Sequence, residues 1–203
     1  MSWMDPSAFD LLLSGDLGTR VRWARSHKCP CVEPQGGASQ TCTVCDGLGV
    51  YWDTPSLPFK AGLTAMQSKE VARQAAKAEG LVGDAQISIP LSAPCYGEVK
   101  PYDRFLVPDA TDSVEWLITP RAPVRLPVGA VVLGVHALSG GKVVTATLPA
   151  AGDDGRIRVA RPATVQLRVP KHYEVIDDAG HMRAWQEGLP QKWSLKRIDV
   201  TVR

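Results

Sequence analysis

Short runs of alternating apolar and polar residues cover the C-terminal part of the chain. They include Ile87 to Leu91, Val114 to Ile118 and Ile198 to Val202. A period of two places every second side chain on the same face of a β-strand, so each run predicts a strand with one buried face. The close spacing of the runs predicts a mainly β domain, a small barrel or a sandwich, over residues 81–203.

Turn residues separate these runs at short intervals. Gly140–Gly141 and Asp153–Gly155 are typical of hairpin turns, because Gly and Asp tolerate the positive φ that such turns require. Several of the 16 prolines stand where we expect a strand to end, since proline cannot donate to a sheet ladder. These prolines are Pro90, Pro108, Pro120, Pro127, Pro149, Pro162 and Pro170.

Residues 1–59 are expected to form a compact module that begins with a helix. Pro6 to Leu13 predicts this helix, with Asp5 as its N-cap and Gly15 near its end. Arg20 to Arg25 alternates charged and apolar residues, which predicts a strand leading into a cluster of cysteines.

Residues 60–80 are expected to form a linker arm or a helix. The segment from Leu63 to Glu79 lacks Gly and Pro and is rich in Ala, Gln, Lys and Glu, which favours a helix. Its apolar stripe, which includes Met66 and Val71, is thin, so a hairpin or a mobile arm stays open as an alternative.

Composition is that of a globular protein with little bulk attraction for nucleic acid. Hydrophobic residues make up 44% and charged residues 22%, and 23 basic against 21 acidic residues give a net charge of +2. The longest apolar stretches, such as Val128 to Val135, are shorter than the roughly 20 residues needed to cross a bilayer. No basic segment precedes Leu11 to Leu13, so we expect no secretory signal and synthesis in a host cytoplasm.

Four of the five cysteines form two close pairs, Cys29 with Cys31 and Cys42 with Cys45. Four thiolates in this arrangement predict a tetrahedral zinc site, although the first pair is spaced by one residue instead of the usual two to four. The set leaves no coordination position for water or substrate, so the zinc is expected to be structural. Cys95 is expected to be a buried apolar residue.

Other uses of these cysteines stay open. An iron–sulfur cluster also takes four cysteines, but no redox-partner signal flanks them. Reduced structural thiols, or disulfides formed after release from the cell, are further alternatives. His27 could replace one thiolate, although a surface position is the simpler expectation. The spacing from Cys42 to Cys45 also occurs in thiol oxidoreductases.

The sequence carries no other catalytic constellation. The four histidines are scattered, and no nucleophile elbow, phosphate-binding loop or dinucleotide fingerprint is present. We therefore predict no catalytic residues and no enzymatic activity. Trp185 and Trp193 are candidate interface residues, because aromatic side chains are enriched in protein contacts, with core packing as the alternative.

Five segments of the first half of the chain together resemble a known class of proteins. They are Arg22-Trp23, Cys29-Pro30-Cys31, Cys42 to Tyr51, Gly83 to Pro90 and Tyr102 to Phe105. In this order they resemble the head-to-tail connector or neck proteins of tailed bacteriophages.

The resemblance implies a non-enzymatic structural protein of the virion. It would form a homo-oligomeric ring with a small β-barrel core and arms that clasp neighbours. It would contact the portal or adaptor and tail proteins, while DNA passes through without sequence-specific binding and no membrane is involved. Two alternatives remain: a zinc-ribbon nucleic-acid binder, supported by Arg20, Arg22, Arg25 and Lys28, and a thiol oxidoreductase.

Overall fold

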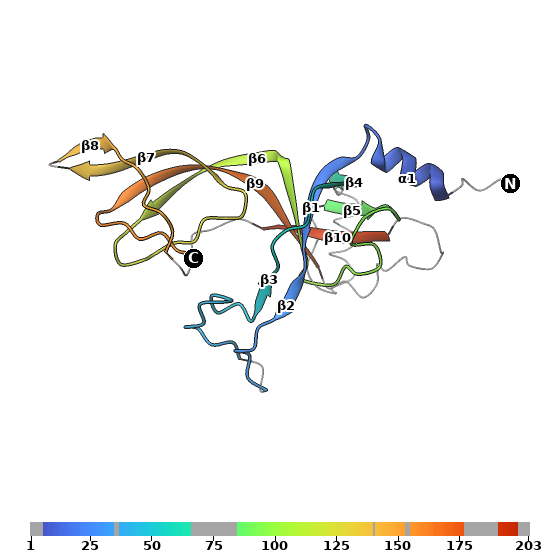
Figure 1. Cartoon of the computed structure of the whole chain (residues 1–203), viewed down its shortest axis with the longest axis horizontal. Coiled ribbons are helices and arrows are strands. Elements are labelled where there is room, and N and C mark those ends of the chain that lie inside the picture. The colour runs from blue at the N-terminus through green and yellow to red at the C-terminus, as the bar shows by residue number, and fades with distance from the viewer. Residues whose placement is uncertain are drawn as a thin grey trace, which may run out of the picture. The chain divides into compact units, whose positions relative to one another are not determined.

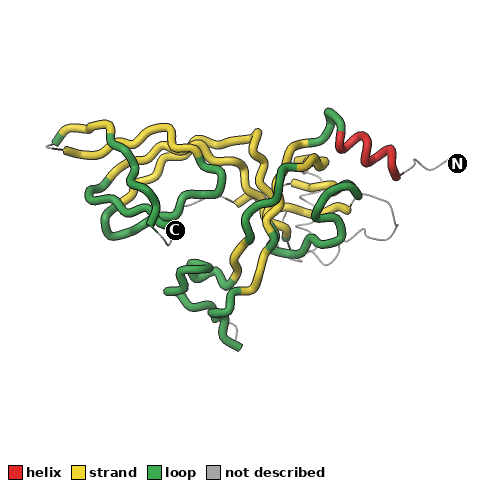
Figure 2. The backbone as a smooth tube through the Cα atoms, in the orientation of Figure 1, coloured by secondary structure: helices red, strands yellow, loops and turns green. Residues whose placement is uncertain are grey.

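The computed structural model describes residues 6–34, 37–65, 85–139, 141–152, 155–176 and 191–198, which form a mainly β protein (Figures 1 and 2). The described residues contain one helix, α1 (Pro6–Ser14), and no helix long and apolar enough to span a bilayer. The strands are β1 (Thr19–Ala24), β2 (Ser26–Lys28), β3 (Val50–Trp52), β4 (Phe59–Ala65), β5 (Ala85–Ile89), β6 (Arg104–Ile118), β7 (Val131–Ser139), β8 (Lys142–Thr145), β9 (Ala163–Val175) and β10 (Gln191–Ile198).

The chain divides into two compact units. Unit 1 comprises Met1–Pro108 and His172–Ile198, and unit 2 comprises Asp109–Lys171 and Asp199–Arg203. Strands β6 and β9 contribute residues to both. This division differs from the one expected at residue 81, because strands from the N-terminal part of the chain complete a sheet with later strands.

Unit 1 contains a closed six-stranded barrel, which confirms the predicted fold class. Its strands follow the order β10-β5-β4-β1-β6-β9, and β9 pairs with β10 to close the circle. The pairings of β1 with β4 and β6, of β5 with β4 and β10, and of β9 with β10 are antiparallel. Fully buried apolar side chains fill the core, among them Val21, Ala61, Ile87, Ile89, Phe105 and Leu195.

The structure differs from the sequence prediction for two segments in the N-terminal part of the chain. The predicted helix and strand are confirmed as α1 and β1, but β1 pairs with β4 and β6 and so belongs to the barrel. The helix predicted from Leu63 is wrong at its start, because Leu63 to Ala65 pair with β5 as the end of β4. Asp5 and residues 66–84 lie outside the described residues.

Polar contacts and close packing hold helix α1 against the rest of unit 1. Asp10 accepts hydrogen bonds from the N–H groups of Leu91 (2.6 Å) and Ser92 (3.1 Å). The Lys60 ammonium donates to the carbonyl of Gly15, which follows the helix. Other side chains of this region are left exposed, namely Leu11, Leu12 and Leu17.

Unit 2 is built on an antiparallel sheet with the order β6-β9-β7-β8. The start of β6 lies beside the end of β9, where Val175 N donates to Asp103 O, and Ile118 at the end of β6 shares a core with Ala163 at the start of β9. These two strands therefore run antiparallel, as do β7 with β9 and β7 with β8. The core on one face of this sheet comprises Trp116, Ile118, Val124, Val135, Ile157, Ala163, Val165, Leu167 and Val169.

The predicted turn at Gly140–Gly141 is confirmed by the β7–β8 hairpin. Ser139 pairs with Lys142, which leaves a two-residue loop, and Gly141 has a φ of 78°. Such a loop requires positive φ, which glycine adopts without steric cost. The turn predicted at Asp153–Gly155 is described only in part: Gly155 N donates to Gly152 O, while Asp153 and Asp154 lie outside the described residues.

Two prolines do not end strands as predicted. Pro108 lies inside β6 and Pro170 lies inside β9. Both stand where pairing with a neighbouring strand stops: β1 pairs with β6 only as far as Leu106, and β9 pairs with β7 as far as Arg168 and with β10 from His172. A proline is tolerated there because its missing N–H is not needed by a neighbouring strand.

Candidate metal centre

The two cysteine pairs sit at the end of a short hairpin. Strands β2 and β3 pair through Ser26 with Trp52, His27 with Tyr51 and Lys28 with Val50. The chain between them, from Cys29 to Gly49, carries both pairs, and we call this segment the cysteine module. Cys29 N donates to Gly49 O at 2.8 Å, which closes the module at its base.

The four cysteine sulfurs converge as the sequence predicts. The Sγ atoms of Cys29, Cys31, Cys42 and Cys45 all lie within 4.8 Å of one another. Cys29 Sγ is 3.7 Å from Cys42 Sγ, and Cys31 Sγ is 3.4 Å from Cys45 Sγ. A metal at about 2.3 Å from each sulfur of a tetrahedron requires sulfurs about 3.8 Å apart. The separations therefore fit a metal ion, and none of these cysteines forms a disulfide.

Tight turns bring the sulfurs together. Asp46 N donates to Cys42 O and Leu48 N donates to Cys45 O, both at 2.9 Å. Gly49 has a φ of 75°, and a side chain there would press against Val32 and Ala38 at 3.2 and 3.3 Å. Only glycine fits this backbone without strain.

Backbone donors and burial act on the cysteine thiols in opposite directions. The N–H groups of Cys45 and Val44 donate to the Cys42 sulfur and lower its pKa to about 6. Burial, together with the sulfurs of Cys29 and Cys45, raises the pKa of Cys31 to about 12. Four thiolates at these separations repel one another, so a bound cation is needed to hold all four deprotonated.

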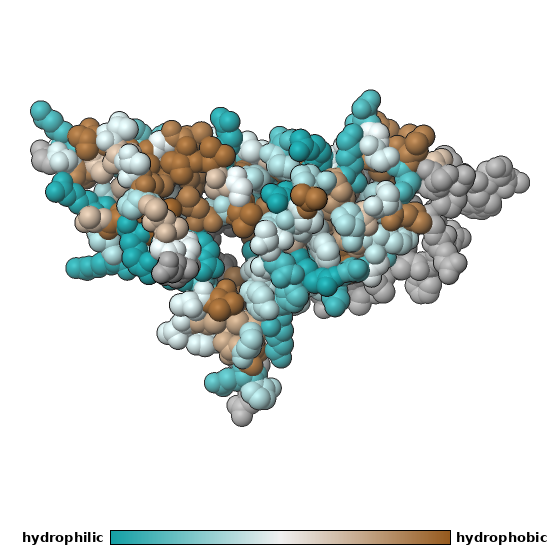
Figure 3. All heavy atoms as spheres, viewed as in Figure 1, coloured by the Kyte–Doolittle hydropathy of each residue, from teal (hydrophilic) through white to brown (hydrophobic). Residues whose placement is uncertain are grey.

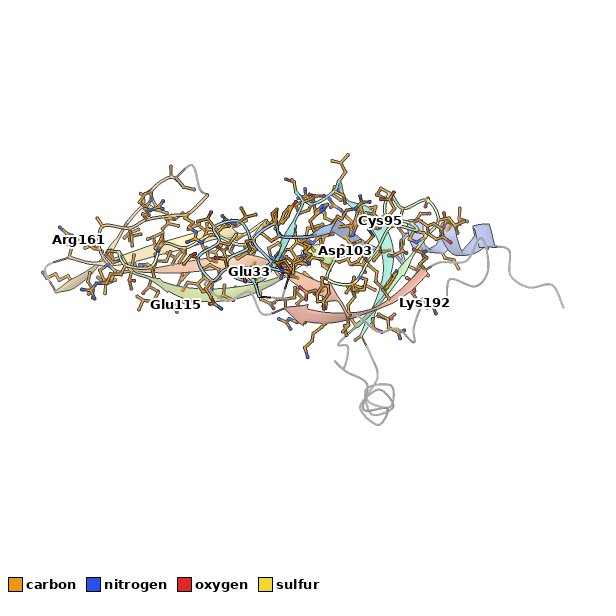
Figure 4. All side chains as sticks on the ribbon, turned by 90° about the horizontal axis from the view of Figure 1, so that it is seen from below. Glu33, Cys95, Asp103, Glu115, Arg161 and Lys192 are labelled. Atoms are coloured by element: carbon orange, nitrogen blue, oxygen red, sulfur yellow. The ribbon has the colours of Figure 1, made fainter. Side chains whose placement is uncertain are left out.

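A buried carboxylate, Asp103, ties the base of the hairpin to the barrel. It is fully buried at the start of β6 (Figure 4). Its oxygens accept hydrogen bonds from Trp23 Nε1 (2.8 Å), Ser26 N (2.7 Å), Ser26 Oγ (2.8 Å) and Lys100 N (3.1 Å). A buried carboxylate with this many donors fixes the chain that passes it, here the junction of β1 and β2.

Trp52 anchors the other strand of the hairpin. Its Nε1 donates to Tyr102 O at 2.8 Å, and the Arg104 guanidinium lies 3.3 Å from the centroid of its ring. Arg104 in turn donates to Glu174 Oε2 at 3.0 and 3.1 Å. Sequence reasoning assigned no role to Asp103 or Trp52. A sequence signal for this region was the segment Tyr102 to Phe105, which is one of the five segments that carry the resemblance. This segment contains no motif that assigns a role to Asp103.

The other predicted site residues take places outside the cluster. His27 stacks on Tyr51, and its Nε2 lies 2.8 Å from Asp53 Oδ2, so it is not a fifth member of the sulfur cluster. Cys95 is fully buried, as predicted, and burial raises the pKa of its thiol to about 12.

The two candidate interface tryptophans have different outcomes. Trp193 is half-buried in β10, opposite Ile87 of β5. Trp185 lies outside the described residues. An interface role for either stays a prediction.

The basic residues near the module are engaged in contacts within unit 1. Arg22 donates to the carbonyls of Ser56 (2.8 Å) and Pro55 (3.0 Å). Arg25 pairs with Glu98 and lies over the ring of Trp23. Arg22 and Arg25 are two of the four residues named in support of nucleic-acid binding, and both therefore make contacts with other parts of this chain.

Comparison with known proteins adds no family assignment. The sequence matches no protein-family model and no curated protein. The class defined by fold and site is therefore a β-barrel protein with a four-cysteine cluster that can hold a metal ion.

Proposed function

We propose that the cysteine module binds one zinc ion through Cys29, Cys31, Cys42 and Cys45. Zinc prefers tetrahedral sulfur sites, and the sulfur separations fit its bond lengths. Four sulfurs complete the coordination, so the ion would staple the module and take no part in a reaction. The residues of the module bury few apolar side chains, which leaves the metal as the main source of its order.

We further propose that the protein is a structural component of a tailed-phage virion and forms a ring in the head-to-tail connector. The resemblance of the first half of the chain suggests this role. The observation that carries it furthest is the amount of apolar surface left uncovered on both units (Figure 3). Large apolar side chains exposed in groups, as around α1 and on β7 and β8, are typical of surfaces that partner chains cover.

The anchoring of the cysteine module supports a docking role for it. Asp103 and Trp52 fix both strands at its base, so the module is presented from the barrel as a rigid element. A rigid, metal-stapled element loses little conformational entropy when it binds a neighbour.

The two alternatives draw less support from the contacts of unit 1. A nucleic-acid surface needs basic side chains that face a partner, and Arg22 and Arg25 are used internally. A thiol oxidoreductase needs a cysteine pair that is free to react. The pKa of Cys42, lowered to about 6, suits such a role, but Cys42 and Cys45 lie within 4.8 Å of two further sulfurs, so that all four can bind one ion.

Single-particle imaging of intact virions tests the connector proposal. We expect ring density for this chain between the portal and the tail. Negative-stain images of the purified protein mixed with its portal should show the same ring added to the portal. Absence of the chain from mature particles, or its presence only as an isolated monomer, would contradict the proposal.

A further inference from the structure

The sheet of unit 2 has two edges to which the described residues add no strand. Strand β8 ends the strand order at one side. At the other side, β1 pairs with β6 only from Arg104 to Leu106, which leaves residues 109–118 of β6 without a described strand on the side away from β9. Unpaired edges present backbone N–H and C=O groups that can bind another strand.

The backbone groups on the outer edge of β8 can be assigned from the hairpin. Ala146 N donates to Val135 O at 2.9 Å, so these two residues form a hydrogen-bonded pair. Hydrogen-bonded and non-hydrogen-bonded pairs alternate along an antiparallel ladder. The pairs of Val143 with Leu138 and of Thr145 with His136 are therefore non-hydrogen-bonded, and Val143 and Thr145 direct their N–H and C=O groups away from β7.

Both edges carry apolar side chains on the same face of the sheet. On β6, Trp116 and Ile118 face the core, so Leu117 faces the opposite side and is 65% exposed. On the hairpin, Leu138 (61% exposed) and Val143 (70% exposed) lie on this same opposite face. A strand added to either edge would bring further apolar side chains beside them.

The charges of the two edges differ in sign. Residues 109–118 of β6 contain no basic residue, and Glu115 lies on their exposed face (Figure 4). Residues 141–146, which include β8, contain Lys142 and no acidic residue. Two β6 edges would repel each other, whereas a β6 edge and a β8 edge attract.

We propose that β8 of one copy pairs antiparallel with residues 109–118 of β6 in the next copy, so that the unit 2 sheet continues from subunit to subunit. Four antiparallel strands place β6 and β8 in opposite directions, so the next copy's β6 continues the alternation in the same orientation. The contact joins two different surfaces, and such heterologous contacts close into rings when the rotation between copies permits. This inference specifies the interface of the proposed ring.

Removing one backbone donor tests the edge of β8. Val143→Pro deletes the outward N–H of Val143 and leaves the hydrogen bonds of the β7–β8 hairpin in place. We expect light scattering after size-exclusion chromatography to show an oligomer for the full-length chain and a shift to the monomer mass for Val143→Pro. Val143→Ala keeps the N–H and should retain most of the oligomer. Circular dichroism and thermal unfolding verify that both variants are folded.

A second variant tests the opposite edge. Leu117→Lys removes an exposed apolar side chain from β6 and adds a positive charge that repels the Lys142 edge of the next copy, so it should also shift the mass toward the monomer. A wild-type chain that stays monomeric at its highest soluble concentration would overturn the proposal, as would an oligomer that persists in a folded Val143→Pro variant. A dimer that is insensitive to Leu117→Lys would instead indicate pairing of β8 with a second β8, and would equally overturn it.

These outcomes are separable from those of the connector proposal. If the chain self-associates through these edges but is absent from virions, the connector proposal fails and the interface stands. If the chain forms a ring in virions that Val143→Pro and Leu117→Lys leave intact, the interface fails and the connector proposal stands.

Discussion

The barrel of unit 1 and the cysteine module are stabilised by different means, although the module is inserted in the chain between two barrel strands, β1 and β4. The barrel buries a continuous set of apolar side chains, including Phe105, Ile87 and Leu195. Over the 19 described residues of the cysteine module, from Cys29 to Gly49, only Cys29 and Cys45 are buried. Hydrophobic burial can therefore account for the barrel but not for the module, which depends on its sulfurs and on its attachment to the barrel.

Removing the metal should give the largest difference between the two regions, because it should affect the cysteine module and not the barrel. Chelation, or the substitution Cys42→Ser, should abolish zinc binding and the amide-exchange protection of residues 29–49, while the barrel stays protected. The metal-linked free energy of such sites is about 10 kcal/mol or more, far above any single side-chain contact. Metal analysis and hydrogen exchange measure both effects, with Cys95→Ser as the matched cysteine control. Protein purified without zinc but with a protected module would contradict the prediction.

A cavity in the barrel core should have the opposite effect. Phe105→Ala removes a fully buried ring and should lower the free energy of unfolding by about 3–5 kcal/mol. Zinc content should stay at one ion per folded chain. Chemical denaturation gives the stability, and Leu57→Ala at an 85% exposed position serves as the control, with an expected change within about 0.5 kcal/mol. Loss of zinc from the folded Phe105→Ala variant would show that the regions are not separate.

Asp103 joins the two regions, so its removal should weaken both. Asp103→Ala leaves the donors of Trp23, Ser26 and Lys100 without an acceptor and should lower the free energy of unfolding by about 2–4 kcal/mol. Faster exchange of the Ser26 amide should accompany this loss. Asp103→Asn keeps one acceptor oxygen and should be less severe. Equal stability of Asp103→Ala and the wild type would show that this carboxylate is not needed for the attachment.

The fifth cysteine should behave as part of the barrel and not of the module. Burial raises the pKa of Cys95 to about 12, so at pH 8 it is a protonated, shielded thiol. Alkylation of the native protein should modify Cys95 slowly, and denaturation should remove the protection. Cys95→Ala should change stability by about 1 kcal/mol at most and leave zinc content unchanged. Rapid modification of Cys95 in the folded chain would contradict its buried position.

The cysteine cluster could be predicted from the sequence because its four cysteines are close together in the chain. Two pairs separated by a short loop can meet through local turns alone, and residues such as Gly49 supply the required backbone. The attachment of the module could not be predicted in this way. Asp103 is 77 residues from Ser26, and no local pattern brings a carboxylate to a backbone amide across that distance.

The sequence by itself determined the mainly β class, the helix at Pro6–Ser14, the hairpin turn before Lys142 and the clustering of the four cysteines. Each of these depends on local periodicity, turn chemistry or ligand spacing. Only the tertiary structure decided that β1 lies between β4 and β6 in a barrel, that β6 and β9 continue through Pro108 and Pro170, and that two edges of the unit 2 sheet have no partner strand among the described residues. These features depend on which distant strands pair, and pairing is selected by the burial of the whole apolar core, which no single segment encodes.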